Sequence, residues 1–116
     1  MLPVTELRFA LDRSLCDTSD VYTGHVMDPA AYVEDAKKSL LEALCEPFWV
    51  RATVCAPAFP DHAEGEIVEG YCLAERNGYW LVYSPDELRF YCFWGTAREN
   101  LGAHGVFGSA LACWLA

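Results

Sequence analysis

The sequence has few basic residues, and this shortage narrows the range of partners that the chain can bind. Eight lysines and arginines stand against 17 aspartates and glutamates, which gives a formal net charge of −9. A field of this sign repels nucleic acid phosphates and anionic membranes, and it attracts basic protein surfaces. We therefore expect no nucleic acid and no membrane partner, and we favour a partner with a basic surface.

Long apolar runs are also missing. No window approaches the roughly 20 apolar residues that a transmembrane helix needs. Near the amino terminus, Glu6, Arg8 and Asp12 interrupt the apolar pattern, which differs from the unbroken apolar core of a secretion signal. These features predict a cytoplasmic protein.

The cysteines lack the pairs and clusters that bind metals. There is no C-x-x-C pair, and the spacings do not match those of zinc ligands. Five of the six lie in apolar segments, where a free thiol behaves as a small hydrophobic side chain. We expect reduced core cysteines rather than disulfides, and no bound metal. The six residues are Cys16, Cys45, Cys55, Cys72, Cys92 and Cys113.

No catalytic motif is present. Cys16, His25 and Asp28 have the side chains of a nucleophile, a base and an orienting acid, but no strained glycine turn surrounds the cysteine. The glycines of GAHGVFG lead into a β-like apolar run, whereas a phosphate-binding loop leads into a helix. We therefore expect no enzymatic activity and no cofactor.

The apolar residues predict one domain that contains a long helix. The chain is 53% hydrophobic over 116 residues, which suits a single core, so we expect one domain over 1–116. Asp28 followed by Pro29 is typical of a helix start, and apolar residues then repeat at helical spacing, which predicts a helix over about 29–45. Segment 4–15 fits either a helix, through its leucines, or a strand, through VTELRF.

From residue 48 onward, the apolar pattern alternates with a period of two and predicts strands. Asn77–Gly78 is typical of a type I′ hairpin turn, and Pro85 in SPDE predicts a type I turn. The fold class is therefore α+β, an antiparallel β-meander of about four to five strands with one long helix packed on one face. The expected strands are FWVRATVC, IVEGYCLAER, YWLVY, LRFYCFW and a fifth at 106–115.

The residues at 77–95 include seven aromatic side chains, more than one core face needs. The turns predict the pairs Arg76/Tyr79, Ala74/Leu81, Cys72/Tyr83, Leu81/Phe90 and Tyr79/Cys92. This register places Leu81 and Phe90 on the core face. We expect the opposite face to be exposed, unless segment 4–15 or 106–115 covers it, and a slip of one residue would exchange the two faces. That opposite face comprises Ile67, Glu69, Tyr71, Leu73, Glu75, Trp80, Val82, Arg89, Tyr91 and Phe93.

The loop PDHAEGEIVE, residues 60–69, is rich in carboxylates. It lacks the regular ligand alternation of a calcium loop, so it is either a solvated acidic loop or a docking site for lysine and arginine side chains. Acidic and aromatic side chains on one sheet face are typical of protein interfaces with basic partners. The predicted partner-binding residues are Asp61, Glu64, Glu66, Glu69, Tyr71, Glu75, Trp80 and Tyr91.

A small acidic α+β domain that is rich in tryptophan and tyrosine and has free cysteines resembles the immunity proteins of bacterial polymorphic toxin and contact-dependent growth inhibition systems. The resemblance lies in the character of the whole chain and not in a signature motif. It implies that the protein binds a cognate toxin domain, commonly a basic nuclease, and blocks its active site. Two other hypotheses remain: a small-ligand-binding protein or enzyme with an aromatic pocket between curved sheet and helix, and a homodimer joined through the aromatic face.

Overall fold

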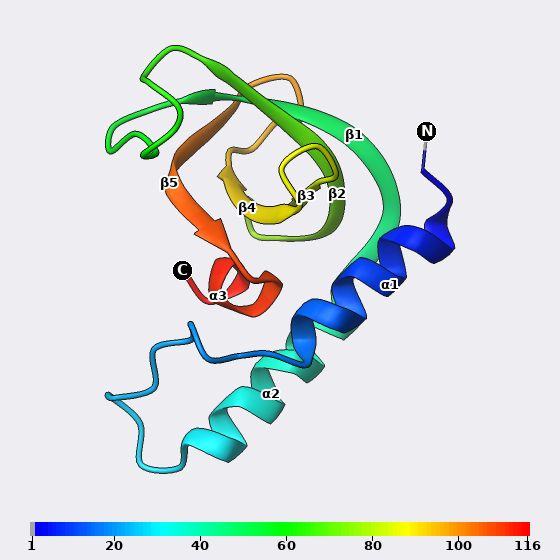
Figure 1. Ribbon diagram of the computed structural model, residues 1–116, viewed down its shortest axis with the longest axis vertical. Helices are drawn as coiled ribbons and strands as arrows, with labels where there is room; N and C mark the ends of the chain where they lie inside the picture. Colours follow the sequence, from blue (N-terminus) through cyan, green and yellow to red (C-terminus); the bar gives the residue numbers. More distant parts are fainter. Residues whose placement is uncertain (1) are drawn as a thin grey trace.

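Five strands close into a small barrel in the computed structural model, which describes residues 2–116 (Figure 1). Consecutive strands pair antiparallel, and a short parallel pairing of residues 52–54 with 101–103 joins the last strand to the first. The predicted five-stranded meander is therefore present, but its ends meet. The strands are β1 (Leu44–Val54), β2 (Ile67–Arg76), β3 (Tyr79–Ser84), β4 (Arg89–Trp94) and β5 (Leu101–Gly108).

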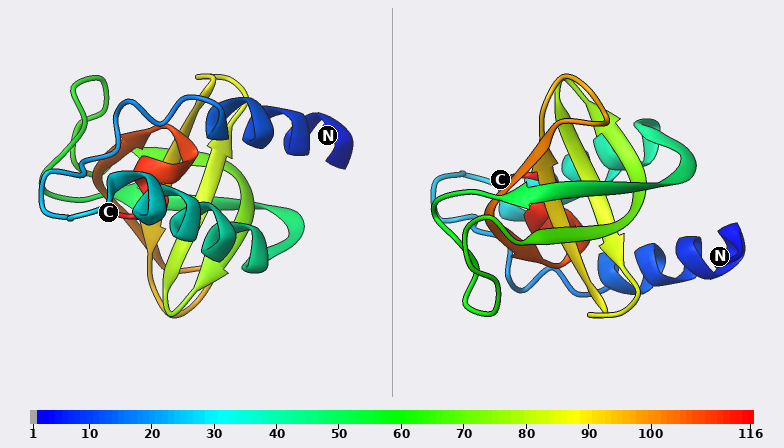
Figure 2. Two further views of the ribbon diagram at one scale, coloured as in Figure 1. Left: turned by 90° about the horizontal axis from the view of Figure 1, so that it is seen from below. Right: turned by 90° about the horizontal axis from the view of Figure 1, so that it is seen from above.

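Within residues 2–116, three helices accompany the barrel, where the prediction was one long helix with segment 4–15 left open between helix and strand. The predicted long helix is α2 (Pro29–Glu42), and Asp28 caps it because its Oδ1 accepts a hydrogen bond from Ala31 N at 3.1 Å. The ambiguous amino-terminal segment forms α1 (Val4–Leu15). Helices α1 and α2 lie on the same side of the barrel (Figure 2). Within residues 2–116, no helix combines the length and the apolar character that crossing a bilayer requires.

The carboxy-terminal segment differs from the predicted strand at 106–115. Strand β5 ends at Gly108, and the next residues form the short helix α3 (Ala110–Trp114). Ser109 starts this helix, since its Oγ accepts a hydrogen bond from Ala112 N at 3.2 Å. The apolar run ALACWLA is compatible with a buried strand or a buried helix, and the cap and the alanines decide for the helix.

The first hairpin has the predicted register at its tip. Arg76 pairs with Tyr79, and Asn77 and Gly78 both have positive φ angles, 53° and 83°. This matches a type I′ turn, which needs positive φ at both positions. A bulge at Leu73 then shifts the ladder by one residue, so the predicted pair of Cys72 and Tyr83 is wrong. The bulge moves the side chain of Cys72 to the inside of the barrel and that of Tyr71 to the outside.

The second hairpin is shifted by two residues from the predicted register. Leu81 pairs with Cys92 where the prediction was Phe90, and Tyr79 pairs with Trp94 where the prediction was Cys92. The shift arises because the turn is longer than SPDE: residues 85–88 all lie in it, and Leu88 adopts a φ of 55°. A shift of two residues preserves the side-chain alternation, so each face keeps its predicted members on β3 and β4.

Both faces of the β3–β4 hairpin are buried except at Tyr79 beside the first turn, which is 37% exposed, and this burial overturns the predicted exposed aromatic face. Trp80 is 9% exposed and Tyr91 is 0% exposed, because barrel closure turns their face into the barrel interior. Leu81 and Phe90 lie on the outside, where the helices cover them. Tyr71 is also buried on the outside, and its hydroxyl accepts a hydrogen bond from Leu2 N at 3.1 Å. These aromatic side chains therefore belong to two cores, one inside the barrel and one between the barrel and the helices. Because they are buried, they cannot form a homodimer interface unless the protein unfolds.

Candidate functional site

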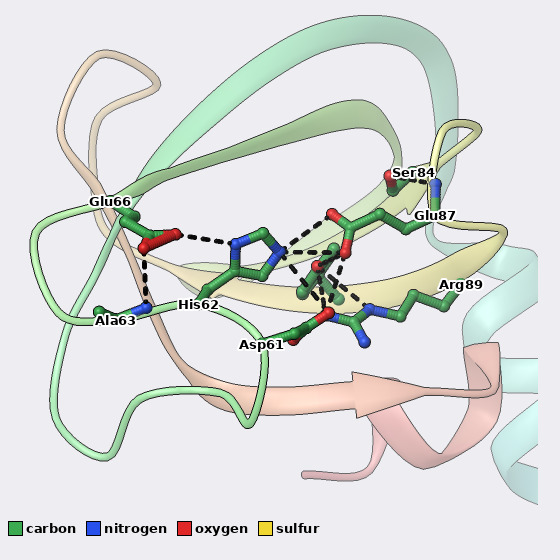
Figure 3. A network of polar contacts seen from close by, with 8 residues as sticks. Asp61, His62, Ala63, Glu66, Ser84, Glu87 and Arg89 are labelled. Carbon is green, nitrogen blue, oxygen red and sulfur yellow. Dashed lines mark hydrogen bonds and ion pairs between the residues drawn. The ribbon is translucent and has the colours of Figure 1, made fainter.

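A cluster of charged side chains lies where the β1–β2 loop meets the β3–β4 turn (Figure 3). The loop is held by Phe59, which is buried in the core inside the barrel and contacts the ring of Tyr91 at a centroid distance of 5.2 Å. Backbone hydrogen bonds between Phe59 and His62 form a tight bridge. This anchoring brings His62 from the loop next to Glu87 from the turn.

His62 lies between two carboxylates. Its Nδ1 is 3.2 Å from Glu66 Oε1, and its Nε2 is 3.1 Å from Glu87 Oε2. Hydrogen bonds to carboxylates at both ring nitrogens favour the protonated imidazolium, which donates from both. The bond to Glu87, followed by the bond to Glu66, raises the pKa of His62 above its usual 6.5, although partial burial opposes the shift. The amide of Ala63, followed by His62, lowers the pKa of Glu66.

Arg89 is the second cation of the cluster. Its Nη2 donates to Asp61 Oδ1 at 2.9 Å and to the Tyr91 hydroxyl at 2.7 Å. The Tyr91 hydroxyl in turn donates to Glu87 Oε2 at 2.7 Å. The bond from Arg89 lowers the pKa of Asp61, while burial and the bond to Glu87 raise the pKa of Tyr91. The cluster therefore connects the acidic loop to the barrel through ion pairs and hydrogen bonds between alternating acidic and basic side chains.

The cluster also contains a group of potential metal ligands. One ligand atom from each of Asp61, His62 and Glu87 lies within 4.8 Å of the others. However, Arg89 Nη2 lies 2.9 Å from Asp61 and 3.1 Å from Glu87, so its guanidinium already occupies the position of a cation between them. A metal would have to displace Arg89 and remove a proton from His62. The donor set therefore favours an ion-pair network over a metal centre.

The predicted acidic residues divide into two groups. Asp61, Glu64, Glu66 and Glu69 belong to the β1–β2 loop and the start of β2, at one end of the barrel. Glu75 lies near the other end of β2, eight positions along the strand from Ile67. There it accepts a hydrogen bond from Gly78 N at 3.4 Å. The structure thus joins Asp61 and Glu66 through His62, keeps Glu64 and Glu69 next to them along the chain, and separates Glu75 from all four.

The exposed part of the predicted sheet face lies on β2 and continues onto β1. Ile67 is 55% exposed, as predicted, and Trp49 on the neighbouring strand is 39% exposed. Glu69 lies between them, and its Oε2 accepts hydrogen bonds from Trp49 Nε1 at 3.2 Å and from Arg51 Nε at 3.0 Å. Trp49 was not predicted as a surface residue. The alternation in WVRATV, with small or branched side chains at every second position, contained this signal.

A groove of about 690 Å³ borders the cluster at Arg89 and lies between the end of α1, the β3–β4 turn and the end of β5. Arg13, Tyr83, Leu88, Arg89 and Phe90 are among its lining residues. Leu88 is 77% exposed and has a φ of 55°, in the left-handed region that leucine rarely adopts. Strained residues of this kind often mark functional positions.

Comparison with known proteins adds no further information about the site. The chain matches no protein family, no curated protein sequence and no solved structure.

Proposed function

We propose that the protein is an immunity protein that binds a toxin domain with a basic surface, one to one, and blocks its active site. The observation that supports this proposal most strongly is the group of carboxylates Asp61, Glu64, Glu66 and Glu69 at one end of a rigid barrel. In a nuclease cleft, carboxylates can occupy the positions of substrate phosphates and pair with the arginines and lysines that bind them. The net charge of −9 adds a long-range attraction toward such a cleft.

The ion pairs within the loop support a binding role because they fix its shape before the partner arrives. Arg89 holds Asp61, and His62 holds Glu66. Ordering a loop in advance lowers the entropy lost on binding. Glu64 forms no ion pair with any other residue of 2–116, so its carboxylate stays available to a partner.

Co-expression tests the proposal. The gene next to that of this protein is to be expressed as a candidate toxin, and the expected result is survival of the host and a complex of one copy of each chain. The variant Glu64→Lys/Glu66→Lys should weaken the complex by roughly 10- to 100-fold, because the new charges repel a basic cleft. Glu34→Lys/Asp35→Lys is the matched control, since it makes the same charge change on exposed positions of α2. If both variants weakened the complex equally, the effect would come from the net charge of the protein alone, and the proposed binding site would be refuted.

A second candidate function rests on the groove. Because side chains fill the barrel interior, an aromatic pocket for a small ligand would have to be this surface groove, where Tyr83 and Phe90 lie beside Arg13 and Arg89. Such a lining suits a small aromatic or aliphatic anion. Substitution Arg13→Glu separates the candidates, because it should abolish binding of an anionic ligand such as benzoate while leaving toxin neutralisation unchanged.

A further inference from the structure

The outer face of β1 and β2 carries a short row of exposed side chains. Trp49, Arg51 and Thr53 alternate with the buried Val50, Ala52 and Val54, so they point away from the barrel. Across the ladder, Arg51 pairs with Glu69 and Thr53 pairs with Ile67. No helix lies in front of these two strands in the right-hand view of Figure 2. We call Trp49, Arg51, Thr53, Ile67 and Glu69 the outer patch.

Trp49 is held in one orientation although it is at the surface. Its Nε1 donates to Glu69 Oε2 at 3.2 Å, and its ring meets the ring of Tyr71 edge to face, with centroids 4.9 Å apart. Tyr71 is buried and is itself held by Leu2 N at 3.1 Å. A fixed aromatic side chain loses little rotamer freedom on binding, which is the property of an interface anchor.

The ring of Trp49 is not occupied by an arginine of the described residues 2–116. Within residues 2–116, arginines lie over Phe9, Phe48, Phe107 and Trp114, at centroid distances of 5.9, 3.8, 4.3 and 4.5 Å. The one guanidinium of the outer patch, Arg51, is paired with Glu69 at 3.0 Å. The indole therefore retains its capacity to stack with a cation from outside.

The charges around the outer patch favour a cationic occupant. Glu66 is already paired with His62, but Glu64 forms no ion pair within residues 2–116 and precedes Ile67 along the chain. Together with Glu69 inside the patch, it stands against the one cation Arg51. Arginine fits better than lysine, because a planar guanidinium can stack on the indole while its N–H groups reach a carboxylate. A lysine ammonium is a compact, strongly hydrated charge that gains less from stacking.

We propose that the outer patch binds an arginine of the basic partner, with Trp49 as the stacking anchor, Glu69 as the carboxylate that the guanidinium reaches, and Ile67 as the apolar contact beside it. The proposal rests on the proposed function, because it names the contact by which the immunity protein would recognise its toxin. The proposed aromatic anchor is thus Trp49 at the surface, whereas the sequence predicted Trp80 and Tyr91, which are buried.

Titration with an arginine-rich peptide and a lysine-rich peptide of equal length tests the proposal. Calorimetry at 0.15 M salt, where the Debye length is about 8 Å, suppresses the long-range attraction that both peptides share. We expect the arginine peptide to bind roughly 10-fold more tightly than the lysine peptide and to quench the fluorescence of Trp49. Trp49→Ala should remove this preference, and Trp49→Phe should restore part of it.

Phe9→Ala is the matched control, since it removes an exposed aromatic side chain from α1 without touching the outer patch. Far-ultraviolet circular dichroism confirms that each variant is folded. Equal binding of the two peptides, or unchanged binding to Trp49→Ala, would overturn the proposal. Toxin neutralisation by Trp49→Ala at full strength would also overturn the proposal while leaving the immunity function intact. Trp49-dependent peptide binding without any toxin neutralisation would refute only the proposed function.

Discussion

Removal of the Trp80 side chain should severely destabilise the protein, because this ring fills the barrel interior. Trp80 is 9% exposed, its Nε1 donates to Gly95 O at 2.9 Å, and its ring meets Phe48 edge to face. Replacing a buried tryptophan with alanine costs about 3 to 5 kcal/mol, and leaving the Gly95 carbonyl without its donor adds about 1 kcal/mol. We therefore expect Trp80→Ala to lose about 4 to 6 kcal/mol, a large part of the roughly 5 to 15 kcal/mol that stabilises a domain.

Urea unfolding, followed by circular dichroism, measures this loss. Trp49→Ala is the matched control at the surface and should lose only about 1 kcal/mol. Trp80→Phe should fall between wild type and Trp80→Ala, because phenylalanine restores volume but not the hydrogen bond. A loss of stability below about 1 kcal/mol for Trp80→Ala would contradict the burial of this ring in the barrel interior, since removal of an exposed ring from an open sheet costs about that much.

Three further predictions concern pH, backbone packing and thiols. The pKa of His62 is raised in the folded state, so the stability that its ion pairs contribute is complete below pH 6.5 and is lost as pH rises through the folded-state pKa. The urea midpoint of the wild type should therefore fall over this pH range, and the urea midpoint of His62→Gln should not. Gly70→Ala should destabilise strongly in the same assay, since its Cβ would overlap a carbonyl oxygen of β3. In native protein, a thiol reagent should modify the exposed Cys16 rapidly and Cys45 more slowly, because burial raises the pKa of the Cys45 thiol; Cys113 should react only after unfolding.

The parts of the fold that local chemistry determines were predictable. The Asp28–Pro29 start located α2, and the Asn77–Gly78 turn located the first hairpin. The closure of the barrel was not predictable, because it depends on contacts between residues 52–54 and 101–103, nearly 50 positions apart. The bulge at Leu73 gives no local signal either, and it exchanges the sides of Tyr71 and Cys72.

The candidate site was predictable in its acidic part only. The carboxylates of the loop are visible in the sequence, but the ion pair of Asp61 with Arg89 joins residues 28 positions apart. The alternation of side chains correctly grouped Trp80 with Tyr91, yet alternation cannot tell an exposed face from a barrel interior. Since closure decides that question, the prediction that Trp80 and Tyr91 are exposed was wrong.

Hydrogen–deuterium exchange on the complex with the candidate toxin locates the surface at which the two proteins meet. The proposed contact surface comprises the outer patch and the acidic loop, so amide protection should increase within residues 47–53 and 61–69. The groove residues Arg13, Tyr83, Leu88 and Phe90 should exchange as they do in the free protein. Protection confined to these groove residues, with no change at 47–53 and 61–69, would contradict the proposed contact surface.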